Sequence, residues 1–128
     1  GAVMAKRILI IDDEDDIREV AQLTLEAVGG FEVLTAESGS EGIIKAETEQ
    51  PDAILLDVMM PEMDGITTFK QLQANSLTSN IPVILLTAKV QASDQRRFAE
   101  LGITGMVPKP FDPMTLTDQV VEVLGWQY

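Results

Sequence analysis

The stretch ILIIDDEDD, residues 8–16, sets an apolar run directly against five consecutive acidic residues. An unbroken run of Ile and Leu is typical of a strand that is buried on both faces of a parallel sheet. Crowded carboxylates at the end of such a strand are costly unless a cation lies among them. The stretch therefore predicts a buried strand whose end forms part of a cation-binding site.

Composition narrows the class of protein. The 128 residues suit one domain with its own core, and 45% of them are hydrophobic. A formal net charge of −12 argues against direct binding to nucleic acid or to an anionic membrane. The sequence has no cysteine and no histidine, which excludes thiol catalysis, Ser-His-Asp catalysis and Cys/His zinc sites. It shows no membrane-spanning run and no signal peptide, so we expect a cytoplasmic protein.

Short apolar segments alternate with helical patterns along the chain. The predicted strands are residues 7–11, 31–36, 53–56, 82–86 and 105–107. Helical spacing follows each strand, at Ile17, Val20, Ala21, Thr24 and Val28, at Ile43, Ile44 and Ala46, at Ile66, Phe69 and Leu72, at Phe98 and Leu101, and at Leu116, Val120, Val121 and Leu124. Ser38 and Glu41 form a capping-box pattern, and Asp112-Pro113 is expected to begin the last helix. This alternation predicts an α/β fold, a parallel sheet with helices on both faces.

Functional residues of such folds lie beyond the carboxyl ends of the strands. Asp12 and Asp13 follow the first predicted strand, Asp57 the third, Thr87 the fourth, and Lys109 comes just after the fifth. If the first and third strands are neighbours, three carboxylates, a hydroxyl and an ammonium meet at one edge. Carboxylates gathered in this way suit Mg²⁺, and Mg²⁺ beside a fixed carboxylate and a lysine suits phosphoryl transfer to aspartate.

With these motifs in place, the chain resembles the receiver domain of two-component response regulators, of the chemotaxis-regulator type. The resemblance covers residues 6–124 and rests on ILIIDDEDD, ILLDVMMPEMDG, VILLTAK and VPKPF, each in the family's order and spacing. It implies a flavodoxin-like, doubly wound sheet of five parallel strands in the order 2-1-3-4-5. Residues 1–5 would be a cloning remnant or N-terminal tail, and residues 125–128 a C-terminal tail.

The resemblance also implies a metal site. Asp57 would accept the phosphoryl group, giving an aspartyl phosphate, and would bind Mg²⁺. Asp13 would be a direct ligand of Mg²⁺, and Asp12 would hold it largely through water. The backbone carbonyl of Met59 would be another ligand. Met59 and Lys89 also occupy positions that tune phosphoryl lifetime in the family.

Signalling roles follow from the same resemblance. Thr87 and Lys109 would each contact a phosphoryl oxygen, and Lys109-Pro110 looks like the family's cis peptide bond. The donor would be a sensor histidine kinase or phosphotransfer protein, and the chain would catalyse only its own phosphorylation and dephosphorylation. Thr87 would then switch the surface of the fourth helix, fifth strand and fifth helix toward an output protein or a fused output domain, as a monomer or a weak phosphorylation-dependent dimer. Met106 departs from the family, which usually has an aromatic residue there.

Simpler interpretations apply to some of these residues. The solvated start of a helix accounts for Glu14, Asp15 and Asp16, because acids are favourable at a helix N-terminus. A turn or helix cap accounts for Asp64. One functional alternative stays open, a receiver-like docking module that is never phosphorylated, because Met106 puts the usual route of signal transmission in doubt. A single-domain regulator and a receiver from a larger protein are both compatible with the sequence.

Overall fold

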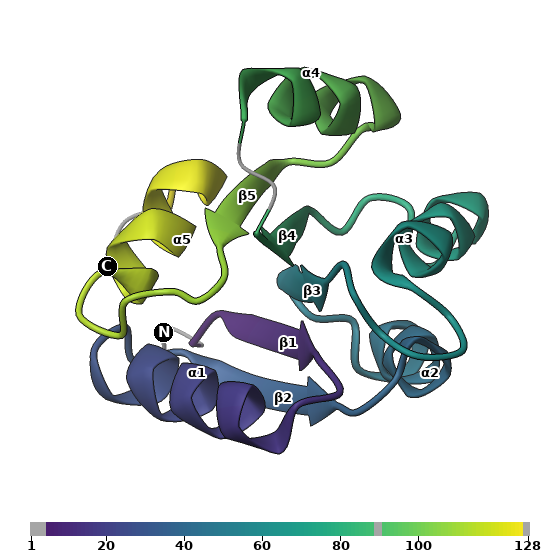
Figure 1. The fold of residues 1–128 in the computed structure, drawn as a ribbon. Helices are drawn as coiled ribbons and strands as arrows, with labels where there is room; N and C mark the ends of the chain where they lie inside the picture. Colours follow the sequence, from purple (N-terminus) through teal and green to yellow (C-terminus); the bar gives the residue numbers. More distant parts are fainter. Residues whose placement is uncertain (1–4, 89–90, 127–128) are drawn as a thin grey trace.

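A computed structural model shows one five-stranded parallel sheet with helices on both faces (Figure 1). The structure describes residues 5–88 and 91–126. Expectations for residues 1–4, for Lys89 and for residues 127–128 therefore lie outside the described residues. The strands are β1 (Arg7–Ile11), β2 (Glu32–Ala36), β3 (Ala53–Asp57), β4 (Val83–Thr87) and β5 (Gly105–Pro108). The helices are α1 (Asp15–Ala27), α2 (Gly39–Glu49), α3 (Gly65–Ala74), α4 (Ala92–Leu101) and α5 (Leu116–Leu124).

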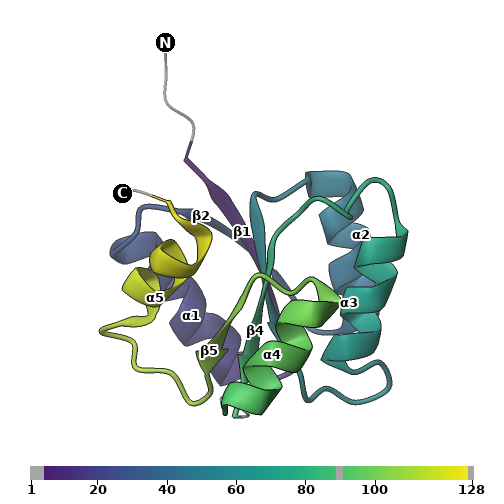
Figure 2. The same cartoon turned by 90° about the horizontal axis from the view of Figure 1, so that it is seen from above.

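The strand order is β2-β1-β3-β4-β5, as the resemblance implied. Alternate residues of the central strands point to opposite faces, so the core has two halves. Ile8 and Ile10 of β1 pack with α1 and α5, whereas Leu9 and Ile11 pack with α2, α3 and α4. Figure 2 shows α1 and α5 together on one side of the sheet and α2 and α3 on the other. The apolar run of residues 8–11 is fully buried because both faces of β1 are covered.

The buried face of helix α1 matches only part of the one that apolar spacing indicated. Ala21 is buried as expected, together with Arg18 and Leu25, whereas Val20 and Val28 are exposed. A similar correction applies to Leu101 of α4, which is 39% exposed although it was expected on the buried side with Phe98. Apolar residues occur around most of α1, so spacing alone does not identify which stripe faces the core.

The predicted helix caps have mixed outcomes. Asp64 is the N-cap of α3, where its side chain accepts a hydrogen bond of 2.8 Å from the Thr67 backbone N–H. The expectation for Asp112 was wrong, because α5 begins only at Leu116. Asp112 instead stabilises the preceding turn, where Oδ1 accepts a hydrogen bond of 2.8 Å from the Met114 backbone N–H.

The Ser38 cap of α2 is present. Its hydroxyl accepts a hydrogen bond of 3.2 Å from the Glu41 backbone N–H. The Glu41 carboxylate accepts its own hydrogen bond from Glu37, one residue before the position that a capping box requires.

Trp126, in the segment expected to be a C-terminal tail, packs against the core. Its ring meets Phe31 edge to face at a centroid distance of 5.7 Å, and the Lys6 ammonium lies 5.3 Å from the Trp126 ring centroid. Both contacts are favourable for an aromatic side chain at a domain boundary. Across the described ranges, none of the helices has the length and apolar character that crossing a bilayer requires.

Candidate functional site

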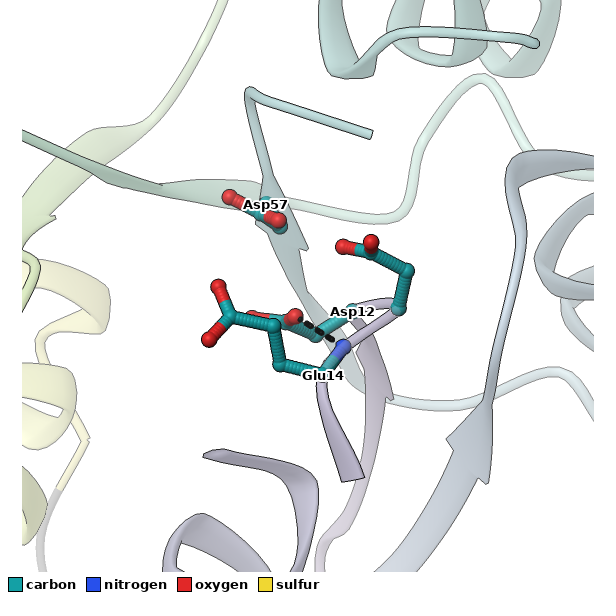
Figure 3. Close-up of side chains that lie close together, drawn as sticks. Asp12, Glu14 and Asp57 are labelled. Carbon is teal, nitrogen blue, oxygen red and sulfur yellow. Dashed lines mark hydrogen bonds between the residues drawn. The ribbon is translucent and has the colours of Figure 1, made fainter. Parts of the chain in front are cut away.

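The carboxyl ends of the strands bring the predicted site residues to one edge of the sheet. Strands β1 and β3 are neighbours, with Ile11 opposite Leu56, so the residues that follow them start side by side. Figure 3 shows Asp57 at the end of β3, with Asp12 and Glu14 reaching from the connection between β1 and α1. The expectation that distant parts of the sequence converge here is therefore confirmed for these carboxylates.

Asp12 is completely buried and its backbone and side chain are both held. Its backbone N–H donates to the Ala36 carbonyl at 3.1 Å. Its Oδ1 accepts a hydrogen bond of 2.8 Å from the Glu14 backbone N–H, and its Oδ2 accepts one of 3.0 Å from Lys109 Nζ. A buried carboxylate with this many partners has a fixed orientation.

Lys109 is the centre of the charged cluster. Its Nζ lies 2.9 Å from Glu14 Oε1, 3.0 Å from Asp12 Oδ2 and 3.2 Å from Asp57 Oδ2. The peptide bond from Lys109 to Pro110 is cis, as the resemblance implied. Burial lowers the pKa of Lys109, but hydrogen bonds to Glu14 and Asp12 and the charges of Asp12 and Asp57 outweigh it, so the pKa is raised. Lys109 is therefore cationic throughout the physiological pH range.

Glu14 has a role that the sequence did not indicate. It was expected to be a solvated residue at a helix start, yet its carboxylate accepts a hydrogen bond from Lys109, 95 positions away. The signal in the sequence was weak, because any acid after Asp13 satisfies a helix N-terminus equally well. In the folded chain Glu14 lies at the solvent-exposed edge of the cluster, and Asp57 is its buried member.

Asp57 is 1% exposed, and its carboxylate is electrostatically strained. Its Oδ1 accepts a hydrogen bond of 3.2 Å from the Met59 backbone N–H. Its buried Oδ2 forms an ion pair with Lys109 without hydrogen-bond geometry. Burial, followed by the charge of Asp12, raises the pKa of Asp57 to about 6 even though Lys109 opposes the shift. Additional positive charge near this carboxylate would relieve the strain.

The cluster offers oxygen ligands to a cation. Asp12, Asp13, Glu14 and Asp57 each contribute one carboxylate oxygen, and these atoms all lie within 4.8 Å of one another. Two oxygens bound to one Mg²⁺ lie about 4 Å apart or closer, so small side-chain movements suffice. An all-oxygen donor set around a buried, strained carboxylate fits a hard divalent cation.

Thr87 and Met59 lie beside the cluster, whereas Met106 does not. A hollow of about 350 Å³ is lined by Asp57, Met59, Thr87 and Lys109, among others. Thr87 is buried at the end of β4, and the Met59 side chain is 77% exposed. Met106 on β5 packs with the core half that includes Phe98 of α4. The hollow therefore places a hydroxyl and an ammonium beside the Asp57 carboxylate.

Comparison with known proteins gives the family. The model of the response regulator receiver domain matches residues 8–121. The chain belongs to this family. The receiver-domain resemblance and the fold expected from it are thereby confirmed, and a receiver domain is a signalling switch rather than an enzyme that turns over a metabolite.

Relatives of this receiver domain include transcription regulators. The chain is 43% identical over 121 residues to the alkaline phosphatase synthesis transcriptional regulatory protein PhoP of Bacillus subtilis, covering 94% of the chain and 49% of the relative. It is 38% identical over 121 residues to the phosphate regulon transcriptional regulatory protein PhoB of Escherichia coli, covering 94% and 52%. The chain thus spans about half the length of these curated relatives.

Solved structures match this receiver domain over nearly their whole length. The chemotaxis response regulator CheY4 of Vibrio cholerae has a TM-score of 0.86 and 32% identity, covering 94% of this receiver domain and 99% of that chain. The receiver domain of the Francisella response regulator 1452 has a TM-score of 0.82 and 28% identity, covering 94% and 97%. The similarity thus covers almost all of both solved chains.

Proposed function

We propose that this receiver domain is the phosphoacceptor of a two-component phosphorelay and that Asp57 carries the phosphoryl group. The observation that carries the proposal is the position of the Lys109 ammonium, 3.2 Å from Asp57 Oδ2 at the floor of an open hollow. Residues 6–124 form the receiver unit in this account, and it acts in the cytoplasm.

The transfer is a displacement at phosphorus. An oxygen of Asp57 attacks the phosphorus of a phosphohistidine on a sensor histidine kinase or phosphotransfer protein. The phosphorus–nitrogen bond breaks, its electron pair stays on the imidazole nitrogen, and the aspartate becomes an acyl phosphate. In this proposal Lys109 offsets the charge on the phosphoryl oxygens, and Thr87, which lines the same hollow, donates its hydroxyl to one of them. A bound Mg²⁺ supplies charge neutralisation and alignment during this step.

Asp12, Asp13 and Asp57, with the Met59 carbonyl, are the residues we propose as the Mg²⁺ site. Fixed backbone and side-chain contacts hold Asp12, while Asp13 is exposed and free to adjust its carboxylate. Glu14 is engaged by Lys109 and forms part of the same acidic set. All of these donors are hard oxygens, which is the preference of Mg²⁺.

Output through α4, β5 and α5 is part of the same proposal. A cavity of about 720 Å³ lies against α4 and β5, and Met106 and Phe98 are among its lining residues. Methionine has a flexible unbranched side chain, so Met106 has both the room and the rotamers to move when Thr87 engages a phosphoryl oxygen. The partner is an output protein or a fused output domain, reached as a monomer or a weak phosphorylation-dependent dimer.

Chemical mapping of the modified residue tests the phosphoacceptor assignment. The chain is incubated with acetyl phosphate and Mg²⁺, then treated with borohydride, which reduces an aspartyl phosphate to homoserine. Peptide mass mapping is expected to find homoserine at position 57 alone. Asp57→Asn should show none, and the matched control Asp64→Asn should behave like wild type, because Asp64 caps α3 outside the cluster. Homoserine at another aspartate would show that the assignment is wrong, and none at all would favour the docking module.

A further inference from the structure

Arg18 is a buried cation outside the set of residues assigned above. It lies on α1 among the residues that face the core, with Ala21 and Leu25, and its side chain is only 11% exposed. Burying a guanidinium is costly unless it is paired and hydrogen-bonded. The contacts of Arg18 must therefore offset the cost of burying its charge.

The guanidinium of Arg18 binds the backbone of the turn between β1 and α1, which carries part of the acidic cluster. Its Nη1 donates a buried hydrogen bond of 2.6 Å to the backbone carbonyl of Asp12. Its Nη2 forms ion pairs with Asp15 on the same helix and, at 3.3 Å, with Glu37 after β2. A planar fork that is held at one end by two carboxylates presents the other end in a fixed direction.

This contact completes the restraint of Asp12. The Asp12 backbone N–H is held by Ala36, its Oδ1 by the Glu14 backbone N–H and its Oδ2 by Lys109. The backbone carbonyl is the remaining polar group, and Arg18 holds it. Because the peptide unit is planar, fixing this carbonyl also fixes the plane that leads into Asp13.

We propose that Arg18 is a positioning residue for the cation site, which orients the Asp12–Asp13 peptide so that the Asp13 carboxylate stands beside Asp57. The inference rests on the proposed function, in which Mg²⁺ occupies the acidic cluster. Asp13 is exposed, and its carboxylate oxygen nevertheless lies within 4.8 Å of the Asp57 and Asp12 oxygens. A fixed backbone plane accounts for this placement of an otherwise free side chain.

A positioning role and a purely electrostatic effect of Arg18 predict opposite changes in Mg²⁺ affinity when Arg18 is replaced. A cation close to the cluster repels Mg²⁺, so an effect of charge alone would make the variant bind Mg²⁺ more tightly. Loss of positioning would make it bind more weakly, since supporting contacts behind a metal site change affinity by roughly 10- to 100-fold. The variant Arg18→Lys keeps the charge and loses the fork, which separates the two effects.

Arg7 provides a matched control at the opposite end of β1. It is also a partly buried arginine, and its Nη1 donates a hydrogen bond of 2.6 Å to the Glu49 carbonyl while Nη2 pairs with the Glu49 carboxylate at 3.1 Å. Replacing it removes a comparable network far along the strand from the cluster. Arg7→Met therefore reports the general cost of losing such an arginine.

The test is a Mg²⁺ titration of the isotope-labelled chain followed by NMR amide shifts, for wild type, Arg18→Lys, Arg18→Met and Arg7→Met. We expect a dissociation constant roughly tenfold higher for Arg18→Lys, a smaller increase for Arg18→Met because the lost positive charge partly offsets the lost positioning, and no change for Arg7→Met. A second measurement, amide hydrogen exchange in the absence of metal, accompanies the titration. The Glu14 amide, which donates to Asp12 Oδ1, should exchange with solvent faster in Arg18→Lys than in wild type.

The outcomes separate the inference from the function on which it rests. If wild type shows no Mg²⁺ binding, the proposed metal site is wrong and the positioning role falls with it. If wild type binds Mg²⁺ but Arg18→Lys binds it equally well or more tightly, the metal site stands and the positioning role is overturned. Should Arg18→Met fail to fold, the Arg18→Lys titration and its amide exchange decide the question alone.

Discussion

Replacing Lys109 with methionine is expected to lower the free energy of unfolding by about 3 kcal/mol at neutral pH in metal-free buffer. Lys109 lies within 3.2 Å of three carboxylates, two of which are buried. Without it, Asp12 and Asp57 face each other as uncompensated charges. Part of the loss is relieved by proton uptake, because the pKa of Asp57 rises further when the ammonium is removed.

Urea unfolding with and without Mg²⁺ measures this effect. A cation that binds the folded state should stabilise Lys109→Met more than wild type, because it replaces the missing positive charge. The control is Lys45→Met, which removes a more exposed ion pair of 3.8 Å with Glu41 together with a hydrogen bond from Lys45 to the Thr35 carbonyl, and should cost about 1 kcal/mol. Equal stability of Lys109→Met and wild type without metal would show that Lys109 does not offset the charges of Asp12 and Asp57.

Replacing Asp57 with asparagine should have the opposite effect and stabilise the metal-free fold at pH 8, by about 3 kcal/mol. The pKa of Asp57 is raised from 3.8 to about 6 by burial and by Asp12. A carboxyl group whose pKa is raised by folding favours the folded state fully below pH 3.8. That contribution is lost as the pH rises through about 6. Asparagine cannot ionise and still offers an oxygen to the Met59 N–H.

The measurement is the difference in unfolding free energy between variant and wild type across pH 3.5 to 8, in the presence of a chelator. The difference should be small at the acid end and grow between pH 4 and 6. Asp64→Asn is the control, because the hydrogen bond from Thr67 lowers the pKa of Asp64, so that its charge stabilises the fold. A pH-independent difference for Asp57→Asn would show that its carboxylate is not strained.

Much of the fold was predictable because parallel strands in this sheet are apolar on both faces. Residues 8–11 and 53–56 have no polar side chain, and both segments proved to be central strands. Helix orientation was less predictable. In α1 the buried stripe includes Arg18, and a charged residue gives no hydrophobic signal for burial. Trp126 was also missed, because its partner Phe31 lies far away in the sequence.

The candidate site was predictable where backbone topology determines position and was missed where long side chains do. Asp12 and Asp57 follow adjacent parallel strands, so their convergence depends only on strand order. The contacts of Glu14 with Lys109 and of Arg18 with Asp12 depend on side-chain rotamers across a turn. Such contacts are not predictable from the sequence, because many orientations of a flexible side chain suit a helix start equally well.

The measurement that tests the central claim most directly is the intact mass of the chain after incubation with acetyl phosphate, with excess Mg²⁺ and with EDTA. The account predicts one phosphoryl adduct in Mg²⁺ and at least tenfold less in EDTA, because the acidic cluster needs a cation to accept a phosphoryl group on Asp57. Equal adduct in both conditions would contradict a cation-dependent phosphoacceptor. No adduct in either would leave a receiver fold that binds partners without phosphorylation.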